Sequence, residues 1–200
     1  NTAAAVVAAT AIAENGTAGA VVYTAPDGAA TGRTYSLTGT DAASFAINAT
    51  TGAVSIIAAA NFEAKASYSF NVTASDGALF SRSVTLAVTN VNEAPTVSSA
   101  ATATVAENGA ANAVVYTATA TDVDAGTTLT YSLGGADAAL FTINAATGAV
   151  SLTAAANFEA KPSYAFTVTA SDGALPSAAQ AVTMAVTNVN EAPVNTSAAT

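Results

Sequence analysis

The stretch that runs from Ile12-Ala-Glu-Asn-Gly16 to Val91-Asn-Glu-Ala-Pro95 recurs from Val105-Ala-Glu-Asn-Gly109 to Val189-Asn-Glu-Ala-Pro193, with acidic residues at matching positions. A repeat at a fixed period defines the unit of folding before any single motif is weighed. The unit here has roughly a hundred residues, which is too long for a solenoid repeat and typical of a domain with its own core. We therefore expect two tandem domains, residues 1–92 and 93–190, followed by the start of a further repeat in residues 191–200.

Apolar and polar residues alternate with period two over several short runs of the second repeat, which is the pattern of half-buried strands. The predicted strands are residues 102–105, 113–121, 129–133, 141–143, 149–152, 164–170 and 181–187. Turn signals containing Gly, Asn or Asp stand between them. Seven short strands in a domain of this size predict an all-β fold, an immunoglobulin-like β-sandwich in each repeat.

Two Ala-rich stretches interrupt the alternation, at residues 136–140 and 154–160. Each is long enough for about one helical turn, which packing must stabilise because so short a helix is marginal alone. Phe158 in the second stretch, and Phe62 at the same place in the first repeat, are the expected anchors against the core.

Composition excludes several functions. The chain is 52% hydrophobic, which suffices for two cores, and 13 of its 17 charged residues are acidic, giving a net charge of -9. Binding to nucleic acid or anionic lipid requires clustered Lys and Arg and is not expected. Cys and His are absent, so thiolate or imidazole catalysis and the usual zinc, copper and iron ligands are excluded. We expect no enzyme activity and no membrane-spanning segment.

Most carboxylates of a repeat fall at strand ends or in connections, where almost no Lys or Arg accompanies them. For Asp41 and Asp137 we favour the simpler interpretation, that each is a turn residue that satisfies local backbone groups. Like charges about 5 Å apart repel by about 0.8 kcal/mol per pair in water and by more in a lower dielectric. A counter-ion is therefore expected, and carboxylate, amide and backbone oxygens are the ligands of calcium.

The order of the motifs resembles tandem cadherin repeats, in the compact form common in bacterial surface proteins. The motifs are Ala13-Glu14-Asn15 and Ala106-Glu107-Asn108, Asn61-Phe-Glu63 and Asn157-Phe-Glu159, Asp122-Val-Asp124, Ala170-Ser-Asp172-Gly173, and the linker Asn90-Val-Asn92-Glu93. No one motif is specific, but five in the family's order, repeated along the whole chain, are informative. The resemblance implies seven-stranded Greek-key sandwiches of the cadherin type.

The resemblance also implies a calcium site shared at the junction of two repeats. Its expected ligands are Glu14, Asn61, Glu63, Asn90, Asn92, Glu93, Asp122, Asp124 and Asp172. A weaker, second set at the other end of the second repeat comprises Glu107, Glu159, Asn188, Asn190 and Glu191. The first repeat has no Asp-x-Asp motif and keeps only Asp27 and Asp76, so its upper end is expected to bind calcium poorly.

These features predict a calcium-rigidified segment of an extracellular stalk, adhesin or fibre at the cell surface, whose partners are calcium, neighbouring repeats and homotypic or other cell-surface molecules. A calcium-dependent polysaccharide-binding module is one alternative, although the six tyrosines lie in strand patterns that favour the core. The other alternative is a filament subunit that donates residues 2–13 as a strand, for which an ordinary first strand is the simpler interpretation.

Overall fold

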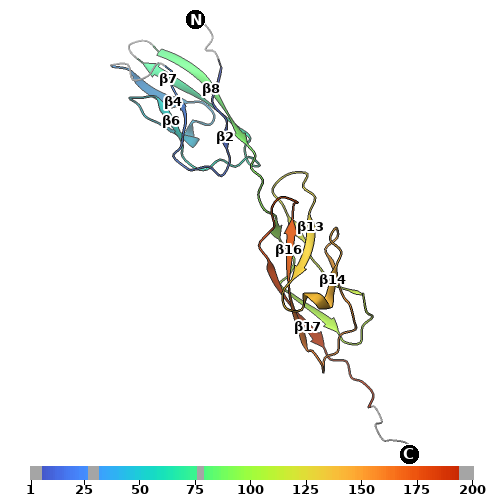
Figure 1. Ribbon diagram of the computed structural model, residues 1–200. Coiled ribbons are helices and arrows are strands. Elements are labelled where there is room, and N and C mark those ends of the chain that lie inside the picture. Colours follow the sequence, from blue (N-terminus) through green and yellow to red (C-terminus); the bar gives the residue numbers. More distant parts are fainter. Residues whose placement is uncertain (1–5, 27–31, 76–78, 194–200) are drawn as a thin grey trace, which may run out of the picture. The chain divides into compact units, whose positions relative to one another are not determined.

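The structure, a computed structural model, describes residues 6–26, 32–75 and 79–193. The chain divides into two compact units, Asn1–Val91 and Asn92–Thr200. Each unit is a sandwich of two β-sheets (Figure 1), so the predicted all-β, immunoglobulin-like fold is confirmed. Within the described residues, no helix is long and apolar enough to cross a membrane.

The first unit has one sheet in the order β1-β8-β7-β4, with β2 also on β8, and a second sheet in the order β3-β6-β5. Its strands are β1 (Val7–Ala8), β2 (Ile12–Ala13), β3 (Val21–Thr24), β4 (Thr34–Thr38), β5 (Phe45–Ile47), β6 (Ala53–Ile56), β7 (Ser67–Ser75) and β8 (Leu79–Thr89). Both β1 and β2 run parallel to β8, so the described part of the N-terminal segment is an ordinary first strand of its own unit.

The second unit repeats this plan, with sheets β10-β17-β16-β13 and β11-β15-β14 and the additional pair β12-β9. Its strands are β9 (Thr96–Val97), β10 (Thr102–Ala106), β11 (Val114–Thr117), β12 (Ala120–Thr121), β13 (Thr130–Gly134), β14 (Phe141–Ile143), β15 (Ala149–Leu152), β16 (Ser163–Ser171) and β17 (Gln180–Thr187). β10 is parallel to β17, as the first strand is to the last in unit one.

The alternation predicted from the sequence is visible in the core. In β16, Tyr164, Phe166, Val168 and Ala170 are buried, and the residues between them are not. Phe166 meets the rings of Tyr116 and Phe141 at centroid separations of 5.7 and 4.8 Å. Tyr35, Tyr116 and Tyr164 are buried, and Tyr23, Tyr68 and Tyr131 pack against the two cores. The core interpretation of the tyrosines is therefore confirmed.

One predicted strand, residues 113–121, is wrong as a single element. β11 pairs with β15, whereas β12 pairs with β9. The carbonyl of Thr119 accepts hydrogen bonds from the N–H groups of Ser98 and Ser99, so the chain leaves one ladder and joins another at that point. The alternation continues through this change of partner, which is why the sequence pattern does not reveal it.

The two Ala-rich stretches differ. Residues 136–140 contain the predicted helical turn as the 3-10 helix η2 (Ala138–Leu140), matched by η1 (Ala42–Ser44) in the first unit. Residues 154–160 form no helix. They end in a turn in which the carbonyl of Asn157 accepts the N–H of Lys161 and its side-chain oxygen accepts that of Ala160.

A pair of charged residues joins this turn to the sheet in each unit. Lys161 Nζ lies 3.0 Å from Asp137 Oδ1 and 5.5 Å from the centre of the Tyr164 ring. Asp137 Oδ2 also accepts the N–H of Ala165 at 2.7 Å. That backbone hydrogen bond and the ammonium of Lys161 lower the pKa of the Asp137 carboxyl. The interpretation of Asp137 as a backbone-satisfying turn residue is confirmed, and it has a cation partner as well.

The second repeat is closely packed around Gly148. It has a φ of +70°, and a Cβ at this position would collide with the carbonyl oxygen of Ala118, whereas Gly126, with a φ of +83°, has nothing within 4 Å of such a Cβ. Gly126→Ala should cost only about 1 kcal/mol of unfolding free energy for the left-handed backbone. Gly148→Ala should cost at least about 3 kcal/mol, because backbone must move. Urea denaturation measures both, and equal losses would contradict the packing described.

The pKa of Asp137 and the pKa of Asp41 are both lowered, the latter by the N–H of Ser69 and by Lys65. The stability of the fold should therefore depend on pH. A carboxyl whose pKa is lower in the folded state stabilises the fold above its unfolded pKa of about 3.9, and this contribution disappears as the pH falls through the folded value. In chelator, the melting temperature of wild type should exceed that of Asp41→Asn/Asp137→Asn most at pH 5 to 7, and the two should converge toward pH 2. A difference that stays constant over this range would refute the assignment.

Candidate metal centre

Glu14 is the buried carboxylate at the end of the first unit's first strand. It directly follows β2 and is only 2% exposed. Its Oε2 accepts the N–H of Phe62 and its Oε1 accepts the N–H of Val91, both at 2.8 Å. One side chain thereby joins the end of the first strand, the turn at residues 61–65 and the segment that leaves β8.

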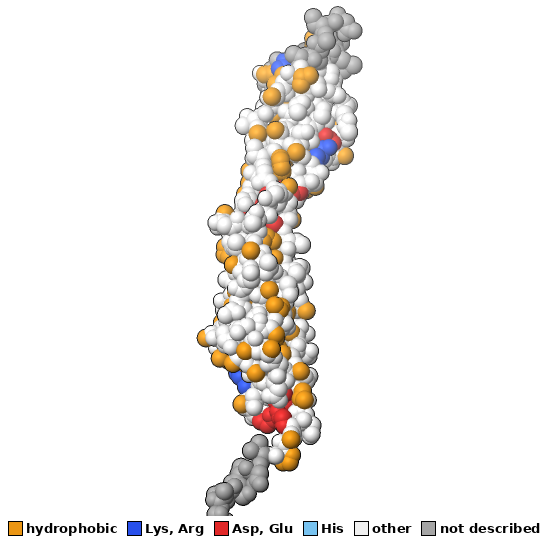
Figure 2. Space-filling view, turned by 90° about the vertical axis from the view of Figure 1, so that its right-hand side faces the viewer, with side chains coloured by type: hydrophobic (Ala, Val, Ile, Leu, Met, Phe, Trp, Pro, Cys, Tyr) orange, Lys and Arg blue, Asp and Glu red, His pale blue; other side chains and the backbone are white. Residues whose placement is uncertain are grey.

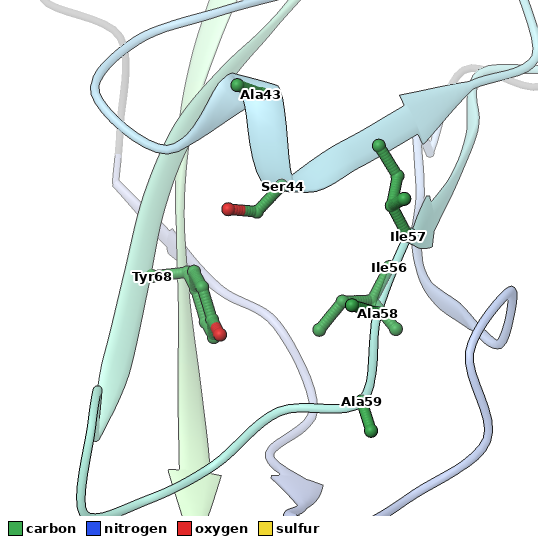
Figure 3. A pocket seen from close by; sticks show the side chains of 7 residues that line it. All are labelled: Ala43, Ser44, Ile56, Ile57, Ala58, Ala59 and Tyr68. Atoms are coloured by element: carbon green, nitrogen blue, oxygen red, sulfur yellow. The ribbon is translucent and has the colours of Figure 1, made fainter.

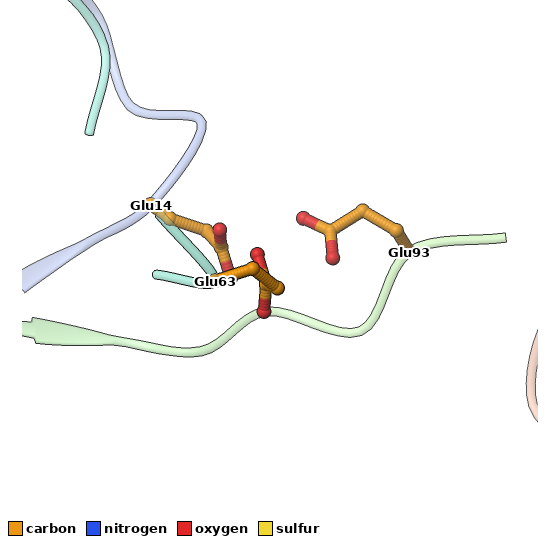
Figure 4. Close-up of side chains that lie close together, drawn as sticks. All are labelled: Glu14, Glu63 and Glu93. Carbon is orange, nitrogen blue, oxygen red and sulfur yellow. The ribbon is translucent and has the colours of Figure 1, made fainter. Parts of the chain in front are cut away.

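Glu63 lies on that turn and faces Glu14. Figure 4 shows the two carboxylates close together beside the segment after β8, and an oxygen of each lies within 4.8 Å of the other. Asn90 donates its amide N–H to Glu63 Oε1 at 3.1 Å. These three predicted ligands are therefore gathered at one end of the first unit.

Asn61 begins the turn that carries Glu63. Its side-chain oxygen accepts the N–H of Ala64 at 2.6 Å, and its carbonyl accepts the N–H of Lys65 at 2.9 Å. Asn157 does the same in the second unit. In this structure the side-chain oxygen of Asn61 closes the turn that presents Glu63.

The start of the second unit gathers five further predicted ligands. Asn92 donates an amide N–H to Asp172 Oδ2 at 2.6 Å, and the backbone N–H of Glu93 donates to Asp124 Oδ2 at 2.9 Å. Asp122 Oδ1 accepts the N–H of Asp124 at 3.0 Å. The Asp-x-Asp motif, the Ala-x-Asp motif and the linker are thus linked by hydrogen bonds within this unit.

The end of the second unit reproduces the arrangement around Glu14. Glu107, 3% exposed, accepts the N–H groups of Phe158 and Val189 at 2.8 and 2.7 Å. Oxygens of Glu107, Glu159 and Glu191 lie within 4.8 Å of one another. Figure 2 shows acidic side chains gathered at one end of the second unit.

Two asparagine side chains donate hydrogen bonds to the carboxylates at this end of the second unit. Asn188 donates to Glu159 Oε1 at 2.9 Å, and Asn108 donates to Glu191 Oε1 at 2.6 Å. Asn190 is exposed, and within the described part of the chain no hydrogen bond joins it to the cluster. Asn108 was missed as a member of the cluster. Its position beside Glu107 in the repeated Glu-Asn-Gly motif was the available signal.

Hydrogen bonds favour the ionised form of two acidic side chains, Glu107 and Asp172. The hydrogen bonds from Phe158 and Val189 lower the pKa of the Glu107 carboxyl despite its burial. The N–H of Leu175 and then the amide of Asn92 lower the pKa of Asp172. Both side chains therefore present carboxylates, the form that binds cations.

Two predicted residues of the first unit's other end, Asp27 and Asp76, lie outside the described residues. So do residues 194–200, most of the expected start of a further repeat.

The described residues of the first unit also form a hollow. Its lining is small and mostly apolar (Figure 3), and consists of Ala43, Ser44, Ile56, Ile57, Ala58, Ala59 and Tyr68. Its polar side chains are the hydroxyls of Ser44 and Tyr68, and no carboxylate or amine is among the lining residues.

The oxygen atoms that these clusters offer as metal ligands fit a hard cation such as calcium. They are carboxylate and amide oxygens without sulfur or imidazole, which is the set calcium prefers. Asp122 Oδ2 is buried and has no hydrogen-bond partner, which is costly unless another ligand satisfies it. The two ion pairs seen among the described residues use Asp41 and Asp137 and leave Glu107, Glu159 and Glu191 without a lysine.

Variants of Glu107 and Glu159 should distinguish a carboxylate that stabilises the fold from one that serves metal binding alone. In chelator, Glu107→Ala leaves two backbone N–H groups without their acceptor and should lower the unfolding free energy by about 2 to 5 kcal/mol. Glu159→Ala, at an exposed position, should change it by less than about 0.5 kcal/mol. Thermal or urea unfolding in chelator measures both, and a Glu159 variant as unstable as the Glu107 variant would contradict these roles.

Comparison with known proteins agrees with the fold. The cadherin domain family model matches residues 101–190. Human protocadherin-24 EC1-2 superposes with a TM-score of 0.73 at 22% identity, covering 89% of this chain and 93% of that chain. Mouse cadherin-23 EC22-24 gives a TM-score of 0.64 at 26% identity, covering 93% of this chain and 63% of that chain. No curated protein matches significantly.

These matches are cadherins, which are adhesion proteins and not enzymes, in agreement with the expectation of a non-enzymatic chain. The chain has the fold of two tandem cadherin repeats, and its second repeat matches the cadherin domain family.

Proposed function

We propose that the chain is an extracellular repeat segment of a stalk or adhesin, made rigid by calcium bound where the two repeats join. The observation that carries this proposal is that each unit gathers oxygen donors, fixed by its own backbone, on the residues next to the linker. The likeness to cadherin extracellular repeats supports it.

The first repeat supplies Glu14, Glu63 and Asn90 to the proposed site. Glu93 corresponds in the repeat to Glu191, whose carboxylate lies with Glu107 and Glu159 at the end of the second unit. By this equivalence we assign Glu93 to the set of Glu14 and Glu63.

The second repeat supplies the other half, Asp122, Asp124 and Asp172, and Asn92 completes the linker. Six carboxylates together carry the charge that three calcium ions balance. Asn61 and Asn90 bring no charge, and the side-chain oxygen of Asn61 already accepts a backbone N–H. We therefore expect two or three ions, with dissociation constants of roughly 10⁻⁴ to 10⁻³ M, as in extracellular modules.

Calcium supplies positive charge that offsets repulsion between carboxylates of the two repeats. A short linker with a small inter-domain interface permits relative motion. Side chains of both repeats that bind the same ions would restrict that motion. The consequence is a spacer whose stiffness depends on the calcium concentration outside the cell, and whose partners are neighbouring repeats and homotypic or other surface molecules of a bacterial-type adhesin.

The alternatives have less support. Polysaccharide binding needs exposed aromatic platforms, whereas the six tyrosines belong to the two cores and, among the described aromatic residues, Phe80 alone is exposed, at 62%. Filament formation by strand donation needs an unpaired donor strand, and β1 and β2 pair with β8 of their own unit. No described feature favours either function.

Thermal unfolding with calcium and with chelator tests the proposal. At calcium concentrations 10 to 100 times the dissociation constant, wild type should gain about 1.4 to 2.7 kcal/mol for each ion bound. Asp122→Asn/Asp124→Asn should lose most of this gain, measured against its own baseline in chelator. Glu159→Gln, at the far end of the second repeat, is the matched control and should keep it.

A melting temperature of wild type that is the same in calcium and in chelator would rule the proposal out. So would calcium stabilisation that the Asp122/Asp124 variant retains in full.

A further inference from the structure

Two of the chain's four positively charged side chains lie close in sequence to proposed calcium ligands, where a positive charge disfavours calcium binding. Lys65 and Lys161 each follow a proposed ligand, Glu63 or Glu159, by two residues on the same turn. Residues two apart in sequence have Cα atoms within about 7 Å, so their charged groups are able to approach to less than one Debye length, which is about 10 Å at moderate salt. An ammonium at this distance opposes the binding of a divalent cation.

Both lysines are held by a partner of opposite charge. Lys65 Nζ lies 3.0 Å from Asp41 Oδ1, with Lys65 side-chain exposure of 42% and Asp41 of 13%. The distance at Lys161 and Asp137 is also 3.0 Å. Each ammonium lies 5.5 Å from the ring centre of a tyrosine, Tyr68 or Tyr164. The same arrangement therefore occurs in both repeats.

The aspartate is itself fixed in place. Asp41 Oδ2 accepts the N–H of Ser69 at 2.8 Å, and its backbone N–H donates to the carbonyl of Ser69 at 3.2 Å. Asp41 directly precedes η1, and Ser69 belongs to β7, so the acceptor for Lys65 is anchored on the sandwich. The turn that carries Glu63 thus has its positive charge neutralised by the body of the domain.

We propose that Asp41 and Asp137 neutralise the lysine on each ligand-bearing turn and direct it away from the carboxylates, so that calcium does not compete with the protein's own ammonium group. This inference rests on the proposed calcium site. It makes Asp41 a positioning residue for the junction, because Lys65 shares its turn with the junction ligand Glu63, and gives Asp137 the same role at the far end.

The test uses calcium titration calorimetry at low ionic strength on the two-repeat chain. Asp41→Asn leaves an uncompensated ammonium near the junction, and a unit charge about 10 Å from a divalent ion in water weakens binding about fourfold, or ~0.8 kcal/mol. Lys65→Gln leaves the aspartate charge uncompensated and should strengthen junction binding by a similar factor. The double variant should return close to the wild-type affinity.

Matched controls come from the second repeat. Asp137→Asn and Lys161→Gln alter the same pair at the far end and should leave the junction affinity unchanged. At 0.5 M salt the opposite effects of Asp41→Asn and Lys65→Gln should shrink toward zero, because screening reduces interactions between exposed charges. Melting temperatures in chelator verify that each variant is folded.

Opposite signs for the two single variants support charge neutralisation. Equal weakening by both, without recovery in the double variant, would show that the pair only braces the turn and would overturn the inference. Wild type that binds no calcium would instead refute the proposed function itself.

Discussion

A buried carboxylate that accepts two backbone N–H groups organises the end of each repeat. Glu14 and Glu107 each link the first strand, the ligand-bearing turn and the outgoing segment through hydrogen bonds of 2.7 to 2.8 Å. A buried charge is tolerated only when such partners compensate its lost hydration. The same contacts place Glu63 and Glu159 beside the buried acid, so the fold and the candidate site share one interaction.

The cost of this arrangement is repulsion between carboxylates within 4.8 Å of one another. The chain has few cations with which to relieve it, and both lysines are engaged by aspartates elsewhere on the sandwich. A mobile hard cation is the remaining means of neutralisation that the donor chemistry favours. The low Lys and Arg content and the acidic clusters are in this account two parts of one design, in which stiffness depends on an external ion.

Much of the fold follows from period-two alternation, as in β16, where every second residue is buried. The break between β11 and β12 could not be predicted, because alternation continues while the pairing partner changes. For the site, the repeated motifs located Glu14, Glu63, Asp124 and their partners, but not the use of Asn61 to close its own turn. The contacts of Asp41 with Lys65 and of Asn108 with Glu191 depend on tertiary placement. For the Asp–Lys pair, the equal sequence spacing of Asp41 and Lys65 and of Asp137 and Lys161 was the available signal.

The central claim is that calcium fixes the two repeats relative to each other. Because the chain contains no cysteine, spin labels can be attached at single cysteines introduced at the exposed strand positions Ser81 and Thr183, one in each repeat. Pulsed electron-electron double resonance then measures the distribution of distances between the two spin labels. The account predicts a broad distribution in chelator that narrows to a single peak in millimolar calcium, and a distribution equally broad in both conditions would contradict it.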